Sequence, residues 1–193
     1  ACSWAVVEHN ALGALIITAS HNPPEWLGLK IKSPSGASVD EDFTRAVEKR
    51  ILFKGKSIPE VQEIQKFNCR KNHLRSLQEK FDIPALVEGM KNMGLHVIVD
   101  SMHGSAAGCI KELLGRESEE FVKEIRTNRD PLFGGNAPEP LEKNLGELIA
   151  ITKKSSQVGQ PSLGLAFDGD GDRIAVIDET GRFCSTQVLI PLF

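Results

Sequence analysis

Short apolar runs alternate along the chain with amphipathic stretches and with loops rich in glycine and proline. Apolar runs bounded by turn residues predict buried strands, and apolar residues spaced three and four apart predict helices. Strands are expected at 13–18, 28–32, 95–100, 121–126, 164–167 and 173–178. Helices are expected near 1–9, after a capping box at 38–41, and at 73–81, 83–93, 106–114 and 141–153.

This order of elements predicts an α/β fold. From residue 73 onward strands and helices alternate, which is typical of a mostly parallel sheet with helices on both faces, a three-layer α/β/α domain. The last two predicted strands are separated only by residues 168–172. A connection this short allows only an antiparallel hairpin, so the sheet is expected to be mixed. The charged, weakly periodic segment 54–72 is interpreted as a linker between domains.

Composition and charge exclude several classes of protein. The chain has 193 residues, of which 40% are hydrophobic and 25% charged, and its net charge is −3. These values are ordinary for a globular protein and give no sign of a nucleic-acid or membrane partner. The four cysteines are far apart in the sequence, and we interpret them as reduced thiols of a cytoplasmic protein without a zinc site. The chain starts without methionine and ends on an apolar run, which suggests a piece of a longer protein.

Three aspartates, Asp168, Asp170 and Asp172, alternate with glycines immediately before Arg173. Carboxylates this close repel one another, and the glycines allow them to converge on one cation. A solvated acidic turn is the alternative interpretation. An EF-hand is excluded because Arg173 stands where that loop needs glycine. A site made of oxygen ligands alone suits Mg²⁺ or Mn²⁺.

Residues 18–24 read T-A-S-H-N-P-P and follow the first predicted strand directly. A lone loop serine usually bonds only to nearby backbone, but Ser20 has His21 and Asn22 beside it and Lys30 shortly after it. A Ser-His-Asp hydrolase is disfavoured because the G-x-S-x-G elbow is missing. A serine that carries a phosphoryl group fits better, since its charge would require a divalent cation and basic neighbours.

Together these two motifs resemble the α-D-phosphohexomutase family, and residues 99–104 (V-D-S-M-H-G) and 136–140 (N-A-P-E-P) are similar to it as well. Leu27 departs from the asparagine that many members carry there. The resemblance implies specific roles for the site residues. Ser20 is expected to be phosphorylated and to bind one Mg²⁺ with Asp168, Asp170 and Asp172. Lys30 is the expected general base, and His21, Asn22 and Arg173 are expected to line the phosphate site.

The resemblance also implies an activity and a domain organisation. The expected reaction moves a phosphoryl group between the 1- and 6-positions of a hexose phosphate, with glucose as the first sugar and the hexose 1,6-bisphosphate as activator. Phosphomannomutase, phosphoglucosamine mutase, a phosphatase and a non-catalytic phosphosugar-binding module remain alternatives. Residues 1–72 are expected to be the C-terminal part of a first domain, 73–184 a similar second domain, and 185–193 the start of a third.

Overall fold

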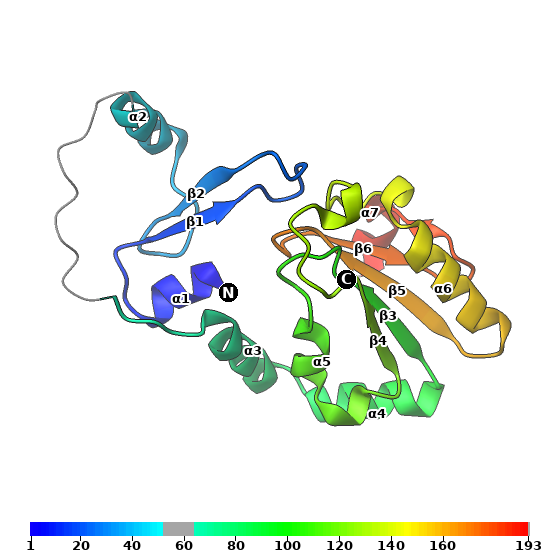
Figure 1. Cartoon of the computed structure of the whole chain (residues 1–193). Helices are drawn as coiled ribbons and strands as arrows, with labels where there is room; N and C mark the ends of the chain where they lie inside the picture. The colour runs from blue at the N-terminus through cyan, green and yellow to red at the C-terminus, as the bar shows by residue number, and fades with distance from the viewer. Residues whose placement is uncertain (52–63, 193) are drawn as a thin grey trace. The chain divides into compact units, whose positions relative to one another are not determined.

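The computed structural model describes residues 1–51 and 64–192 (Figure 1). The chain divides into two compact units, which we describe separately: the first contains residues 1–17 and 28–76, and the second contains residues 18–27 and 77–193. Within the described parts, no helix is both long enough and apolar enough to span a bilayer. The predicted domain limits near residues 72 and 184 stay predictions.

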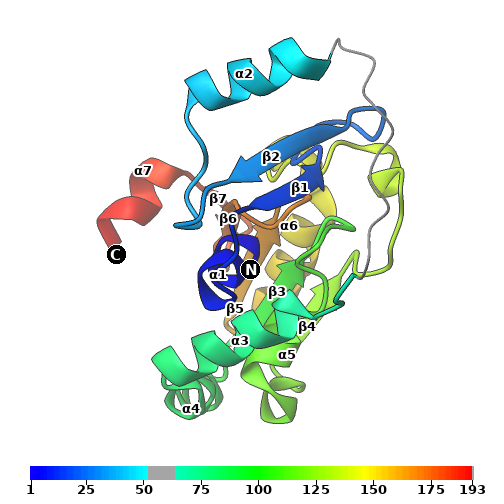
Figure 2. The same ribbon diagram turned by 90° about the vertical axis from the view of Figure 1, so that its left-hand side faces the viewer.

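The first unit contains a two-stranded sheet, β1 (Ala14–Thr18) and β2 (Gly28–Lys32). Helices α1 (Cys2–Glu8) and α2 (Glu41–Ile51) lie on opposite sides of these strands (Figure 2), and α3 (Cys69–Lys80) begins in the same unit. Residues 54–63 of the predicted linker lie outside the described part. From Cys69 onward that prediction is wrong, because the chain there is already helical.

The prediction that β1 is a buried strand is wrong for the described residues. Leu15 and Ile17 on one face expose 70% and 72% of their surface. The reason is that α2 does not pack closely on the sheet. An open groove of about 640 Å³ is lined by Leu15 and Ile31 from the strands and by Phe43 from α2.

The start of α2 also differs from the expected capping box. Asp40, not Ser38, caps the helix, since its Oδ1 accepts a hydrogen bond from the N–H of Phe43 at 2.8 Å. The Ser38 hydroxyl instead accepts a bond from Lys32 Nζ at 3.1 Å. Asp40 lies two residues nearer the helix than Ser38, and aspartate satisfies the free N–H groups at the start of a helix as well as serine does.

The second unit is built on a five-stranded sheet with the order β4-β3-β5-β6-β7. Strand β3 (His96–Asp100) runs parallel to β4 (Val122–Ile125) and to β5 (Ser162–Phe167). Strand β6 (Ile174–Ile177) is antiparallel to β5, which confirms the predicted hairpin and the mixed sheet. The short antiparallel strand β7 (Phe183–Cys184) was not predicted.

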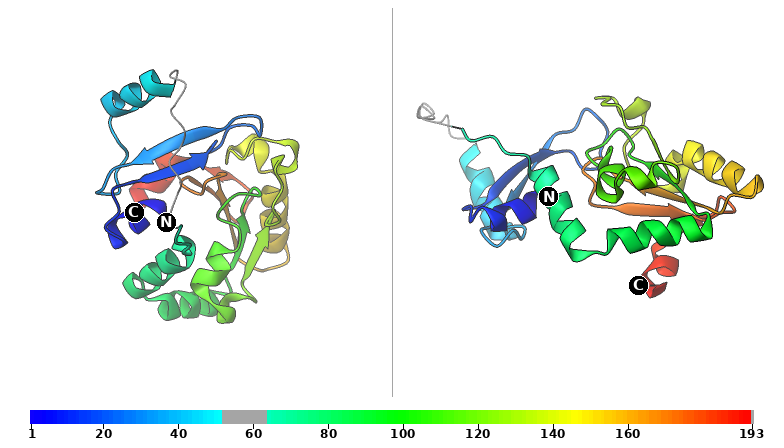
Figure 3. Two further views of the ribbon diagram at one scale, coloured as in Figure 1. Left: turned by 60° about the vertical axis from the view of Figure 1, so that its left-hand side comes forward. Right: turned by 90° about the horizontal axis from the view of Figure 1, so that it is seen from below.

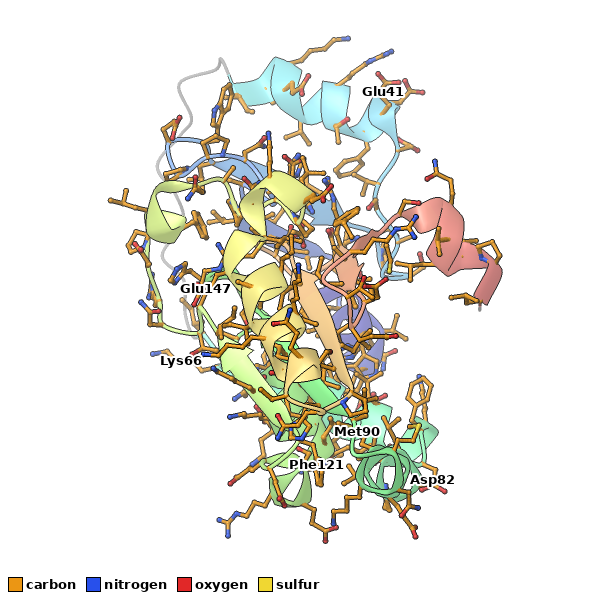
Figure 4. The ribbon with its side chains drawn as sticks, turned by 90° about the vertical axis from the view of Figure 1, so that its right-hand side faces the viewer. Glu41, Lys66, Asp82, Met90, Phe121 and Glu147 are labelled. Carbon is orange, nitrogen blue, oxygen red and sulfur yellow. The ribbon has the colours of Figure 1, made fainter. Side chains whose placement is uncertain are left out.

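Helices cover both faces of this sheet, as expected for an α/β/α domain (Figure 3). On one face, α6 (Gly146–Gln157) and the residue before it bury Leu148 and Leu145 against β3, β5 and β6. On the other face, α4 (Ile83–Met93) buries Met90 beside β3 and β4, and α5 (Cys109–Leu114) packs there too. Figure 4 marks Asp82, which caps α4, and Glu147 in the first turn of α6.

Two helices begin later than expected. Gly108, with φ of 76°, prevents α5 from starting before Cys109. The predicted helix at 141–153 starts at Gly146, after a 3₁₀ turn at Glu142–Asn144. The remaining elements are short: η1 (Arg116–Ser118), η2 (Phe133–Gly135), α7 (Thr186–Leu189) and η4 (Ile190–Leu192).

Asp178 stabilises the turn between β6 and β7 and gives a test of stability against pH. Its Oδ1 accepts bonds from the Thr180 hydroxyl at 2.7 Å and from the N–H groups of Thr180 and Arg182 at 2.9 and 3.0 Å. The Thr180 hydroxyl and then the Arg182 N–H hold the pKa of this carboxyl below its usual value. Because the residue is partly exposed, Asp178→Ala should lower the free energy of unfolding by only about 0.5–1 kcal/mol at neutral pH.

A carboxyl whose pKa is lowered by folding stabilises the fold above its unfolded pKa, and this stabilisation is lost as pH falls through the folded pKa. The difference in Tm between Asp178→Ala and the unaltered chain should therefore shrink from about pH 6 to about pH 3. The exposed neighbour Glu179 supplies the control, since Glu179→Ala should change Tm little at either pH. A constant difference for Asp178→Ala would contradict the role given to its charge.

Candidate functional site

The three aspartates of the loop between β5 and β6 converge. One carboxylate oxygen from each of Asp168, Asp170 and Asp172 lies within 4.8 Å of the others. Gly171 has a φ of 73°, a left-handed conformation that lets the loop turn back on itself, and its N–H donates to the carbonyl of Asp168 at 3.0 Å. The side chain of Asp168 is fully buried, Asp170 is half-buried and Asp172 is exposed, so the loop is solvated only in part.

The environment of Asp168 opposes its negative charge. Burial is the largest cause that raises the pKa of this carboxyl, and the charges of Asp170 and Asp172 raise it further. The N–H groups of Arg173 and Asp172 act in the opposite direction, because they donate to its Oδ1 at 3.1 and 2.9 Å. The other oxygen, Oδ2, lies 3.8 Å from Arg173 Nε and faces the serine described next. A bound cation at this point would offset the repulsion.

The Ser20 loop belongs to the second unit and contacts the aspartate loop directly. The Ser20 hydroxyl lies 3.4 Å from Asp168 Oδ2 and 3.3 Å from Asp170 Oδ1. Ser20 has a φ of 55°, which is strained for a residue with a side chain, and such strain persists only where the surroundings hold it. Thr18 supplies part of that hold, since its hydroxyl accepts the Ser20 N–H at 2.8 Å and donates to Asp170 Oδ2 at 3.1 Å. Two segments 148 residues apart thus place a hydroxyl among carboxylates.

Two glycines allow this close approach of backbones. A Cβ on Gly169 would stand 2.3 Å from the Ser20 carbonyl oxygen and 2.9 Å from Pro138 Cγ. A Cβ on Gly104 would stand 2.7 Å from the Gly169 carbonyl oxygen. The backbone of Gly169 also forms two hydrogen bonds. Its N–H donates to the carbonyl of Pro138 at 3.2 Å, and its carbonyl accepts from the N–H of Ser105 at 2.9 Å. The loops after β3 and β5, the Asn136–Pro140 loop and the Ser20 loop therefore form one assembly.

The other predicted site residues are placed as follows. His21 Nε2 lies 3.8 Å from Glu139 Oε1, and His21 Nδ1 is buried without a hydrogen-bond partner among the described residues. Asn22 is exposed, and its N–H donates to the Ala19 carbonyl at 3.0 Å. Lys30 lies on β2 in the first unit, so it is not part of the cluster that the second unit forms by itself.

Comparison with known proteins identifies the family. The model of phosphoglucomutase/phosphomannomutase alpha/beta/alpha domain II matches residues 71–181, and the model of domain I of the same family matches residues 1–57. The chain belongs to the phosphoglucomutase/phosphomannomutase family. This confirms the resemblance that the two motifs gave, and with it the α/β/α fold class.

Individual members of the family are similar over nearly the whole chain. The phosphoglucomutase/phosphomannomutase of Thermococcus kodakarensis is 33% identical over 95% of this chain and 39% of its own length. The phosphoglucosamine mutase of Methanocaldococcus jannaschii is 29% identical over 93% of this chain and 39% of its own length. A crystal structure from Thermus thermophilus, assigned as a phosphomannomutase, superposes with a TM-score of 0.80 at 33% identity, over 94% of this chain and 40% of that one. The chain therefore spans about two fifths of the length of the relatives it matches.

The aspartate triad is a candidate site for a metal ion. Its donors are all oxygens, they converge from one loop, and one of them is buried beside two like charges. This donor set fits a hard divalent cation better than a soft one.

Sequence reasoning missed the structural roles of three residues in this assembly. Glu139 faces His21, although no role was predicted for this glutamate beyond its place in the N-A-P-E-P segment. Gly169 was expected only to make the aspartate loop bend, but its φ is not in the left-handed region, and its importance lies in the lack of a side chain. The role of Thr18 could have been predicted from the sequence. The hydroxyl of a threonine often accepts a hydrogen bond from the N–H of the residue two positions later, which here is Ser20.

Proposed function

We propose that this chain supplies the phosphoserine and the metal loop of a phosphohexomutase. The observation that carries the proposal is the approach of the Ser20 hydroxyl to within 3.4 Å of Asp168 and 3.3 Å of Asp170. A hydroxyl among converging carboxylates is an arrangement that becomes favourable when a cation binds and the hydroxyl carries a phosphoryl group. The family membership and the names of the relatives support the same activity.

The proposed reaction is a reversible phosphoryl transfer in two halves. In the first half, the P–O bond to Ser20 breaks and the phosphorus bonds to a free hydroxyl oxygen of a hexose monophosphate; the proton of that hydroxyl passes to Lys30, and the released Ser20 oxygen takes up a proton from solvent. In the second half, the Ser20 hydroxyl loses its proton to solvent and bonds to the other phosphorus of the 1,6-bisphosphate; that P–O bond to the sugar breaks, and the released sugar oxygen takes the proton from Lys30. Mg²⁺, held by Asp168, Asp170 and Asp172, would neutralise charge on the transferred group.

The chain's own residues position and balance this reaction. The loop brings the three carboxylates together before any ligand binds, with Asp168 buried at its base, so little reorganisation is needed at the moment of transfer. The guanidinium of Arg173 lies at the edge of the triad and offers positive charge to phosphate oxygens. His21 follows the serine and is proposed to line the same phosphate site with Asn22.

The substrate proposed is a hexose phosphate, with glucose as the first sugar to test and mannose and glucosamine as the alternatives that the relatives' names suggest. The decisive experiment treats the protein that carries this chain with glucose 1,6-bisphosphate and Mg²⁺ and measures the mass of the Ser20 peptide. A stable gain of about 80 Da, followed by its loss to added hexose monophosphate, is expected. A gain that decays only by hydrolysis would indicate a phosphatase, and no gain at all would leave a binding module.

Metal affinity should depend on the phosphorylation of Ser20. Three aspartates and a phosphoserine carry a charge of about −5, of which the phosphate supplies about two units. Mg²⁺ should therefore bind the phosphorylated chain at least about tenfold more tightly than the dephosphorylated chain. The attraction between a cation and a phosphate in contact at a protein surface is larger than the free energy that corresponds to a tenfold change in Kd. Calorimetric titration of both forms measures the difference.

The Ser20→Ala variant is the matched control, and it should bind Mg²⁺ like the dephosphorylated chain. Equal affinity in all three forms would contradict the proposal that the serine shares a cation with the aspartates. A difference that appears with phosphate but disappears in Asp170→Asn would support it.

A further inference from the structure

The Asn136–Pro140 loop lies against both halves of the candidate site. Its Pro138 carbonyl accepts the N–H of Gly169 in the aspartate loop at 3.2 Å. One residue later, Glu139 extends toward His21 in the serine loop, with Oε1 lying 3.8 Å from Nε2. Consecutive residues of this loop thus contact the two motifs from which the site is built.

Glu139 faces Nε2 of the His21 ring, and the other ring nitrogen, Nδ1, lies inside the protein. The two side chains are similarly shielded, with 28% and 29% of their surface exposed. His21 Nδ1 is buried and has no hydrogen-bond partner among the described residues. The carboxylate thus lies on the outer side of the ring, and among the described residues no hydrogen bond holds the ring on its inner side.

The backbone that carries Glu139 is itself held by the buried core. The Glu139 carbonyl accepts a bond from Asn144 Nδ2 at 2.8 Å, and the Asn144 carbonyl accepts a bond from Arg126 Nη2 at 3.2 Å. Arg126 forms an ion pair with Asp100, whose side chain is fully buried at the end of β3. A carboxylate on a loop held in this way can fix the position of a side chain that lies beside it.

Ser20 needs such support, because its left-handed conformation is strained and Thr18 holds it only from the aspartate side. We propose that Glu139 is a positioning residue for phosphoryl transfer at Ser20, and that it acts by holding the ring of His21 and so keeping the Ser20 turn seated on the aspartate loop. This inference rests on the proposed function of Ser20. Loss of the carboxylate would let the turn move, and small displacements of reacting groups are costly to phosphoryl transfer.

The test uses Glu139→Gln, which keeps the shape of the side chain, and Glu139→Ala, both in the protein that carries this chain. Both should lower the rate of Ser20 phosphorylation by glucose 1,6-bisphosphate and the kcat of turnover by roughly tenfold. The KM for hexose phosphate should change less than about twofold, since no substrate contact is removed. The matched control is Glu142→Gln, an exposed glutamate three residues further along, which should behave like the unaltered protein.

A double-mutant cycle separates positioning through His21 from a general structural effect. In a His21→Ala background, Glu139→Ala should cause no further loss of rate. An undiminished further loss in that background, or a wild-type rate for Glu139→Ala alone, would overturn the inference. Failure of the unaltered protein to phosphorylate Ser20 would instead overturn the proposed function and this inference with it.

Discussion

Replacing Lys30 by methionine is expected to lower mutase turnover by roughly 10²–10⁴-fold, the usual cost of losing a general base. Lys30 lies on β2, and the alternation of the strand sets it on the same side as Lys32 and opposite to Leu29 and Ile31. Methionine has nearly the same length but cannot accept a proton. The measurement is steady-state turnover of glucose 1-phosphate in the protein that carries this chain, with a trace of the 1,6-bisphosphate.

The control for this experiment is Lys32→Met on the same strand. Lys32 Nζ donates to the Ser38 hydroxyl at 3.1 Å, and we expect its replacement to change turnover little. Phosphorylation of Ser20 by added bisphosphate should persist in Lys30→Met at a reduced rate. Unchanged turnover in Lys30→Met would remove Lys30 from the mechanism and make His21 the next candidate for the base.

Replacing Gly169 by alanine is expected to slow Ser20 phosphorylation by about 10²-fold, because a displacement near 1 Å of a reacting group has a cost of this size. The added Cβ would stand 2.3 Å from the Ser20 carbonyl oxygen, a distance that real Cβ atoms do not adopt. Pro138 on the other side lies only 2.9 Å away, so the serine loop must move away from the aspartates. The rate of phosphate gain on the Ser20 peptide measures this effect, and weaker Mg²⁺ binding by the phosphorylated form should accompany it.

Gly146 provides a matched control for the same substitution. A Cβ at this position, in the first turn of α6, meets nothing within 4 Å, so Gly146→Ala should leave the rate unchanged and slightly stabilise the helix. A normal rate in Gly169→Ala would mean that the backbone contact with Ser20 does not matter for the reaction. Comparing the Tm of the two variants detects any general loss of folding.

The sheet of the second unit was predictable because its strands are short apolar runs with clear ends. The turn between β5 and β6 left no room for a crossover, so the antiparallel hairpin followed from length alone. Strand β7 has only two residues, too few to show any alternation. Its pairing with β6 depends on the turn that Asp178 stabilises, a contact between side chain and backbone.

The burial of β1 was not predictable from its own residues. An apolar run shows that a strand is able to be buried, but a covering layer depends on elements elsewhere in the sequence. In the described chain, Leu15 and Ile17 face an incompletely covered side of the sheet. The cap of α2 failed for a different reason, because Ser38 and Asp40 are both good caps and only the packing of the loop decides between them.

The parts of the candidate site that are formed by neighbouring residues in the sequence were predictable. The D-G-D-G-D segment and the serine loop each carry most of their own information. His21 and Glu139 lie 118 positions apart in the sequence, and neither segment by itself predicts their contact. The same holds for the contact of Gly169 with Ser20, since its cause is the absence of a side chain.

The path of the chain through the two units limits how this protein can be divided. The polypeptide passes from one unit to the other after residues 17, 27 and 76. The segment with Ser20 therefore belongs to the second unit, although the residues before and after it belong to the first. A polypeptide that begins at residue 77 would keep all three aspartates but lack the hydroxyl that lies among them. Cleavage by a protease after Leu27 would likewise leave both motifs intact while cutting the connection to Lys30. Recombination between related sequences would thus separate residues of the candidate site unless the break lies outside residues 18–173.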